Sequence, residues 1–242
     1  MTARIMPNLY LATLWALALP AWGASAEYAL RWDPGQGGPQ DAQAVLQLLG
    51  LKDDKPKVFL IRYFSVKQPA GLPAGFAVIA RQRETGETTE ASYKLRGPKP
   101  LGKLPKAYRW ACPLTAATAD QDERDITWLA RPAGQPDAGS LPVRTVYSRT
   151  CSTAAKLLDS LPASHQPRAP GCETSMKRFK DKGVKVEVWS MPQGAQILEV
   201  SFKVDDDKAP ARQAFEQGRV RPLLTAGAVP LQENKTQLNS CP

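Results

Sequence analysis

The sequence predicts an α+β protein, built mainly from antiparallel strands in hairpins that form a sheet or an open barrel, with a few helices packed on it. Two observations predict this class. Short runs rich in β-branched and aromatic residues are separated by turns rich in proline and glycine, of which the chain has 22 and 17. Strands mostly follow strands along the chain, which disfavours a parallel sheet with crossover helices.

The first half of the chain predicts one helix among four strands. The helix begins with Pro39 in its first turn and stops at Gly50, and apolar residues between them recur at helical spacing. β-branched and aromatic residues, or alternation of apolar with polar residues, predict strands over Tyr28–Trp32, Val58–Val66, Gly75–Arg83 and Thr88–Leu95. The last two flank Glu84–Glu87 and therefore predict a hairpin.

The second half follows a segment, residues 97–106, with three prolines and three lysines, which is the best candidate linker. Beyond it the patterns predict strands at Ala107–Ala111, Ile126–Ala130 and Val143–Arg149, a hairpin of Val184–Met191 with Gln196–Val204, and helices at Ser152–Leu161 and about Pro210–Gln217. The acidic stretch Asp120–Asp125 lacks the glycine and the spacing of a calcium loop and is interpreted as a solvated connection.

The N-terminus predicts export. Arg4 precedes an apolar stretch, Leu9–Leu19, which is too short to span a bilayer, and Ala24-Ser25-Ala26 is a typical cleavage pattern. We therefore expect a signal peptide over residues 1–26 and a periplasmic or secreted mature protein with no membrane span. Residues 27–242 are expected to form a single α+β domain with a possible subdivision near residues 97–106.

The four cysteines agree with that destination. All four lie after the leader, and an even number of cysteines in an oxidising compartment predicts two disulfides. The chain has no Cys-x-x-Cys pair of the kind that binds zinc. Four cysteines allow three pairings, and we favour Cys112 with Cys151 and Cys172 with Cys241. The first pair ends two strand-like runs, and the second would hold the polar C-terminal tail.

The mature chain is basic. Cleavage removes Arg4 from 32 basic residues and none of the 23 acidic residues, which leaves a charge of +8. This charge is explained by solubility alone, or by a partner that is an anionic small molecule or an envelope polymer. The densest basic run, Lys177–Lys182, holds one aromatic and an acid, and we interpret it as a turn or a helix end. Single-stranded nucleic acid, which needs several aromatic platforms, is therefore disfavoured.

The order of elements resembles the CYTH superfamily, the triphosphate tunnel fold of thiamine triphosphatases and class IV adenylate cyclases. The resemblance is carried by Ala80-Arg81-Gln82-Arg83 and Ser92-Tyr93-Lys94 in the first hairpin, by Leu198–Lys203, and by Lys235-Thr236 near the end. The family opens with two glutamates and a lysine that alternate on one strand. Here that run is Glu27–Arg31, and Ala29 replaces the second acid, which places inherited catalysis in doubt.

Strand alternation supplies cations for a phosphate-binding face. Arg81 and Arg83 share one face of a strand, and Lys94 is expected on its neighbour. The full set of candidate ligand-binding residues is Arg62, Arg81, Arg83, Lys94, Lys185 and Lys203, with Arg144 as a further possibility. Glu187 and Glu199 are the candidate metal ligands, but magnesium is required only if the protein is a phosphohydrolase. The alternative for all of these residues is an ordinary solvated hairpin face.

No catalytic residues are predicted. His165, the only histidine, lies between prolines, and no Gly-x-Ser-x-Gly surrounds a serine. The sequence therefore favours an exported, disulfide-bonded envelope protein that binds an anionic, phosphorylated ligand without catalysis or cofactor. A metal-dependent phosphohydrolase of CYTH-like fold and a purely structural envelope component are the alternatives. The oligomeric state is left open.

Overall fold

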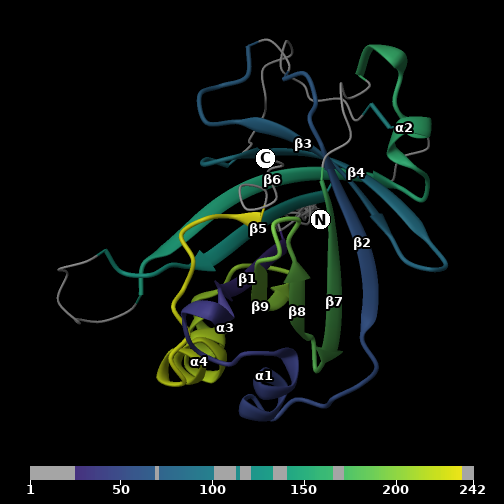
Figure 1. Ribbon diagram of the computed structural model, residues 1–242. Coiled ribbons are helices and arrows are strands. Elements are labelled where there is room, and N and C mark those ends of the chain that lie inside the picture. The colour runs from purple at the N-terminus through teal and green to yellow at the C-terminus, as the bar shows by residue number, and fades with distance from the viewer. Residues whose placement is uncertain are drawn as a thin grey trace, which may run out of the picture.

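Apolar and charged residues alternate along the strands, and this alternation lets one sheet close on itself with two different faces. The computed structural model describes residues 25–68, 71–100, 113–114, 121–132, 141–165 and 172–235. Within these residues the strands are β1 (Ser25–Trp32), β2 (Lys57–Phe64), β3 (Ala77–Glu84), β4 (Thr89–Gly97), β5 (Gln121–Trp128), β6 (Val143–Thr153), β7 (Glu173–Asp181), β8 (Val184–Ser190) and β9 (Gln196–Val204). Figure 1 shows how they curve around into a barrel.

The strands form a closed barrel in the order β1-β5-β6-β4-β3-β2-β7-β8-β9. Neighbours pair antiparallel except β1 and β5, which are parallel and place Glu27 opposite Asp125. The predicted hairpins are confirmed as β3–β4 and β8–β9. The predicted mainly antiparallel architecture is also confirmed, but the barrel is closed rather than open, because β1 pairs with both β5 and β9 and leaves no free edge there.

The helices lie outside the barrel. α1 (Ala42–Leu48), α3 (Ala209–Phe215), a π-helical turn (Glu216–Val220) and α4 (Arg221–Thr225) gather on one side, and the short α2 (Leu157–Ser160) lies near β4 (Figure 1). α1 begins later than Pro39, because the Asp41 carboxylate caps it by accepting a hydrogen bond from the Ala44 N–H at 2.8 Å. Pro39 therefore lies in the segment before the helix rather than in its first turn.

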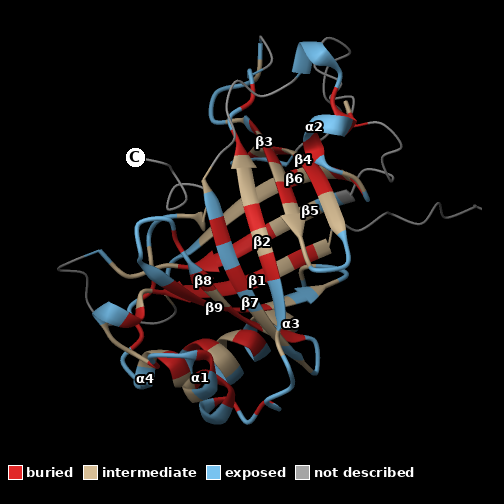
Figure 2. Cartoon of the chain, turned by 45° about the vertical axis from the view of Figure 1, so that its right-hand side comes forward, coloured by how far each residue is buried: buried red, intermediate tan, exposed pale blue. Residues whose placement is uncertain are grey.

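The main hydrophobic core lies between the outer face of the barrel and this helical layer. Tyr28, Leu30 and Trp32 of β1 point outward and pack with Trp128 of β5 and with residues of α1, α3 and α4. Figure 2 shows the buried residues concentrated where helices cover the strands. Trp32 is fully buried, and its indole N–H donates to the Pro39 carbonyl at 3.1 Å. This layer fixes the outward face of β1, and therefore turns Glu27 and Arg31 inward.

Two smaller apolar clusters complete the packing. One lies outside β3, β4 and β6 under α2 and includes Leu157, which is fully buried. The other lies inside the barrel and is formed by Phe59, Ile61, Met176, Trp189, Met191 and Ile197. The interior is therefore apolar along part of its wall and charged along the rest.

Three local predictions are wrong. Residues 121–125 of the acidic stretch are not a connection but part of β5, since pairing with β1 and β6 extends the strand through them. Ser152 and Thr153 end β6 rather than begin a helix, because they pair with Ser92 and Ala91 of β4. The basic run from Lys177 lies within β7 and its following turn, because pairing with β2 and β8 sustains the strand.

Some predictions fall on residues outside the described parts of the chain. These are the strand at Ala107–Ala111, most of residues 97–106, the leader before Ser25, and the two cysteines Cys112 and Cys241. Cys151 and Cys172 are both disulfide-bonded. Because their predicted partners lie outside the described residues, the pairing itself stays a prediction. β1 begins at Ser25, two residues before the predicted mature terminus. Among the described helices, none has the length and apolar character needed to cross a membrane.

Candidate anion-binding site in the barrel interior

A cavity of about 430 Å³ occupies the barrel interior. Charged side chains from strands all around the barrel line it, and the cations outnumber the anions by seven to four. The cations are Arg81, Arg83, Lys94, Arg178, Lys185, Lys203 and Lys235, and the anions are Glu27, Glu90, Glu123 and Glu187. The cavity therefore carries an excess of positive charge inside the barrel, where charges are screened less than on a surface.

Three arginines converge on one part of this wall. The Arg83 and Arg178 guanidinium carbons lie 5.2 Å and 4.7 Å from the centre of the Phe59 ring, so one aromatic ring supports both. Burial, together with the like charges of Arg81 and Arg178, lowers the pKa of Arg83 below its ordinary value. Glu90 is the nearby counter-ion, 2.9 Å from Arg83 and 3.7 Å from Arg81. A bound anion would relieve the mutual repulsion of these cations.

Two polar atoms on the cavity wall are buried without a hydrogen-bond partner in the described part of the chain. They are Nε of Arg81 and Oγ1 of Thr150, and both residues line the cavity. Burying such a group without a partner costs about 1–3 kcal/mol, so native proteins rarely leave one unsatisfied. Acceptor oxygens of a ligand would satisfy both atoms.

Opposite charges meet on another part of the wall. Glu27, Glu123 and Asp125 each place a carboxylate oxygen within 4.8 Å of the others. Hard carboxylate oxygens are suitable ligands for magnesium. Each of the three is already paired, however: Glu27 with Lys185 at 2.7 Å, Glu123 with Lys94 and Lys203 at 3.0 Å each, and Asp125 with Arg96 at 2.9 Å. The donor atoms suit a metal ion, but the ion would have to displace lysine ammonium groups.

The pKa values of these acids record the pairing. Burial by itself would raise the pKa of Glu27, but the charges of Lys185 and Lys235 outweigh it and hold that pKa far below its ordinary value. The pKa of Glu123 is also lowered, because Lys94 and Lys203 offset its burial and the repulsion from Glu27. Both carboxylates are therefore ionised at neutral pH and serve as counter-ions for the lysines.

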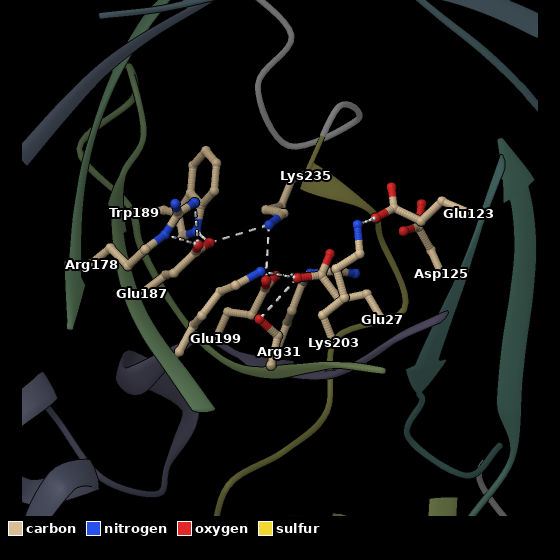
Figure 3. A network of polar contacts seen from close by, with 12 residues as sticks. Glu27, Arg31, Glu123, Asp125, Arg178, Glu187, Trp189, Glu199, Lys203 and Lys235 are labelled. Atoms are coloured by element: carbon tan, nitrogen blue, oxygen red, sulfur yellow. Dashed lines mark hydrogen bonds and ion pairs between the residues drawn. The ribbon is translucent and has the colours of Figure 1, made fainter. Parts of the chain in front are cut away.

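A second acid pair lies deeper, on neighbouring positions of β8 and β9. Glu187 accepts a hydrogen bond from Arg178 at 2.7 Å and from the Trp189 indole N–H at 3.0 Å, and Glu199 is paired with the buried Arg31. Lys235 contacts both carboxylates. Figure 3 shows these side chains pointing toward one another across the interior. Glu187 and Glu199, the candidate metal ligands from the sequence, are thus each held by two basic side chains.

The structure brings most of the predicted cations together. Arg81, Arg83, Lys94, Lys185 and Lys203 all line the cavity. Arg62 does not, because it lies on the outer face of β2, where it pairs with Glu173 at 2.6 Å and Glu84 at 3.5 Å. Arg144 lies apart from this cavity and donates to the Gln232 carbonyl at 2.6 Å.

Sequence reasoning missed several interior residues. Glu123 and Asp125 were assigned to a loop and Arg178 to a turn or a helix end, and Lys235 was named only through the family resemblance. The period-two alternation of Glu123, Asp125 and Thr127 was the available signal for a strand with an acidic face. For Lys235 the family resemblance was the available signal, but its contact with Glu199 was not predictable because only the folded barrel brings the two residues together.

Comparison with known proteins gives only weak similarities to solved structures. No protein-family model matches the chain, and no curated protein does. The barrel is similar to the solved structure of PH1819 from Pyrococcus horikoshii OT3, with a TM-score of 0.48 and 8% identity over 88% of this chain and 96% of the other. PH1012 from the same organism matches with a TM-score of 0.47 and 10% identity over 88% of this chain and 98% of the other. A Vibrio parahaemolyticus protein, provisionally assigned as an adenylate cyclase, gives 0.47 and 10% over 89% and 98%.

These similarities extend along nearly the whole of each matched structure but are weak in both identity and superposition. The candidate site therefore has to be judged from its own residues.

Proposed function

We propose that this protein binds a small phosphorylated anion inside its barrel, without catalysis, as an exported, disulfide-bonded component of the cell envelope. The observation that carries the proposal is the excess of cations around the interior cavity, where Arg81 Nε and Thr150 Oγ1 are buried without a partner among the described residues. CYTH-like membership is part of the proposal, supported by the closed barrel and its basic interior.

The arginines suit phosphate for a physical reason. A guanidinium offers several N–H donors in a rigid plane that matches phosphate oxygens, and the Phe59 ring holds two of these planes in place. An anion entering the cavity would meet donors that are already oriented, so little side-chain entropy would be lost on binding. The carboxylates opposite are neutralised by lysines and would repel such an anion weakly.

Titration calorimetry with inorganic pyrophosphate tests the proposal. We expect saturable binding by the wild-type protein without magnesium, and weakening by about tenfold or more in Arg81→Ala/Lys94→Ala, since charge-assisted contacts contribute about 1.5–3 kcal/mol each when partly buried. Arg62→Ala is the matched control, because Arg62 is an arginine of the same sheet that faces outward.

Two results would contradict it. Absence of binding by the wild type would favour the purely structural envelope component. Equal affinity of the double variant and Arg62→Ala would place the anion somewhere other than this cavity. Unfolding of each variant by urea, followed in parallel, separates loss of binding from loss of fold.

A metal-dependent phosphohydrolase is the second candidate, and the grouping of Glu27, Glu123 and Asp125 is the observation that favours it. In that case the three carboxylates would hold magnesium, which would polarise a phosphoryl oxygen, while the arginines orient the substrate. Release of phosphate from tripolyphosphate only when magnesium is present, abolished by Glu123→Gln, would establish this candidate and overturn the non-catalytic proposal.

Export is tested separately. Expression in a secreting bacterium should yield a mature protein that begins at Glu27, which intact-mass measurement resolves to the residue. All four cysteines should resist thiol reagents, and peptide mapping without reduction should join Cys112 to Cys151 and Cys172 to Cys241. An exported protein that keeps its leader, or a free thiol in the folded protein, would contradict this part of the proposal.

A further inference from the structure

The Lys235 ammonium lies in a site built from three groups. Its Nζ atom is 2.9 Å from Glu199 Oε1, 3.4 Å from Glu187 Oε2 and 4.4 Å from the centre of the Trp189 ring. Both carboxylates are almost completely buried. Burial by itself would lower the pKa of Lys235, but Glu199 and Glu187 raise it above its ordinary value, so the group is a cation. Two carboxylates and an aromatic face are the elements that recognise an organic ammonium.

This site opens onto the anion cavity. Glu187, Trp189 and Lys235 all line the cavity, and Arg178 joins the two regions because it donates to Glu187 while its guanidinium lies over Phe59. A ligand whose anionic end contacts the arginines therefore has the ammonium site within the same enclosed space. Figure 3 shows Lys235 entering this space from the chain above, among side chains of the strands.

The segment that carries Lys235 is irregular and is anchored at several points, one of which is the Arg144 guanidinium that donates to the Gln232 carbonyl at 2.6 Å. Residues 231–234 form neither helix nor strand. The Leu231 N–H donates to the Arg31 carbonyl at 2.9 Å, and the Gln232 amide donates to the Ala130 carbonyl at 2.8 Å. The lysine stem beyond these contacts is long and flexible, so its ammonium can leave the carboxylates without unfolding a strand.

We propose that Glu187, Glu199 and Trp189 form an exchangeable site for a primary ammonium, filled by Lys235 in the ligand-free barrel and by the ammonium of a zwitterionic phosphate ligand in the complex. This proposal rests on the proposed anion binding and names its ligand class, a small aminoalkyl phosphate. The exchange conserves charge: the ligand's ammonium takes over the carboxylates, and the released Lys235 ammonium pairs with a phosphate that is a dianion near neutral pH.

The experiment compares O-phosphoethanolamine with monoethyl phosphate, which have the same phosphate and chain length and differ by the ammonium. We expect the wild type to bind O-phosphoethanolamine about tenfold more tightly, as befits one charge-assisted contact. Lys235→Met, which keeps an apolar stem, should widen this preference because the competing ammonium is gone. The Lys235→Met variant should also acquire saturable binding of ethylammonium alone. Lys177→Ala is the control and should behave as the wild type, because Lys177 is exposed on the outer face of β7.

The outcomes separate the two proposals. Equal affinity of the wild type for the two phosphates would overturn the exchangeable ammonium site and leave anion binding intact. Failure of both phosphates to bind the wild type would overturn the proposed function, and ethylammonium binding by Lys235→Met would still report on the site itself. If Lys235→Met fails to fold, Glu187→Gln supplies the test in its place: loss of the preference for O-phosphoethanolamine supports the site, and an unchanged preference overturns it.

Discussion

The two faces of the β1 strand are both largely buried, but one is apolar and the other is charged. Outward-facing Tyr28, Leu30 and Trp32 pack into an apolar layer under the helices, whereas inward-facing Glu27 and Arg31 enter a network of charges. Apolar burial stabilises the fold in proportion to area and needs no exact partner. Buried charges need a partner each, and the pair as a whole contributes little net stability. The difference implies that the outer face stabilises the fold and that the interior is organised for binding.

The largest effect is expected from the outer layer. Trp128→Ala should lower the free energy of unfolding by about 3–5 kcal/mol, because it removes a fully buried aromatic ring packed against Tyr28 and Phe215 and leaves a cavity. Urea unfolding followed by circular dichroism measures this change. Val58→Ala is the control, since that side chain is 55% exposed on the same barrel and should change stability by about 0.5 kcal/mol or less. Similar losses in both variants would contradict the assigned role of the outer layer.

The interior ion pair of Arg31 and Glu199 should contribute little net stability, in contrast to the outer layer. Arg31→Met should cost about 3 kcal/mol, because it leaves the buried Glu199 with Lys235 as its remaining counter-ion. The double variant Arg31→Met/Glu199→Leu should recover much of that loss, since neither charge then needs a partner. Thermal unfolding of the two variants tests this. A double variant at least as unstable as Arg31→Met alone would show that the pair contributes net stability.

Acid should weaken the interior before the outer layer. The folded-state pKa values of Glu27, Glu123 and Glu187 lie below the ordinary 4.5, because nearby lysines and Arg178 outweigh burial. Groups of this kind add stability above pH 4.5 that is lost as the pH falls toward the folded-state values. Unfolding free energies at pH 7 and pH 3 should therefore differ, and Glu123→Gln should reduce the difference. An unchanged pH dependence in that variant would contradict the assignment.

The smallest effect concerns a polar contact at the border of the outer layer. The Tyr28 hydroxyl donates to Asp207 at 2.9 Å, and burial together with this hydrogen bond raises the pKa of Tyr28 to about 12. Its contribution is present below pH 10 and is lost as the pH rises through the folded-state value. Tyr28→Phe should lower the free energy of unfolding by about 1 kcal/mol at neutral pH. It should also remove the tyrosine that ionises at the highest pH when tyrosinate absorbance is followed during a titration. A wild-type titration complete near pH 10 would refute the raised pKa.

Local sequence patterns identified much of the wall but little of its closure. The hairpins β3–β4 and β8–β9 were predictable because each couples two alternating strands through a short turn. Arg81, Arg83 and Lys94 were correctly grouped for the same reason: alternation and a known register place them on one face. The acids of β5 were missed because their polar sequence resembles a loop, and the strand forms there only through pairing with β6 on one side and with β1, about 100 residues earlier, on the other.

The sequence by itself determined the elements whose signal is local: a basic chain of hairpins, with apolar and charged residues alternating along most strands. Only the tertiary structure decided which charges meet. The parallel pairing of β1 with β5 brings Glu27 to Glu123 and Asp125, and the path of the segment after α4 brings Lys235 to Glu199. Alternation fixes the side of a strand on which a residue lies, but closure of the barrel depends on the outer hydrophobic layer, whose members are distant in sequence. The interior charges are therefore neighbours because the apolar residues on the opposite face of the same strands pack together.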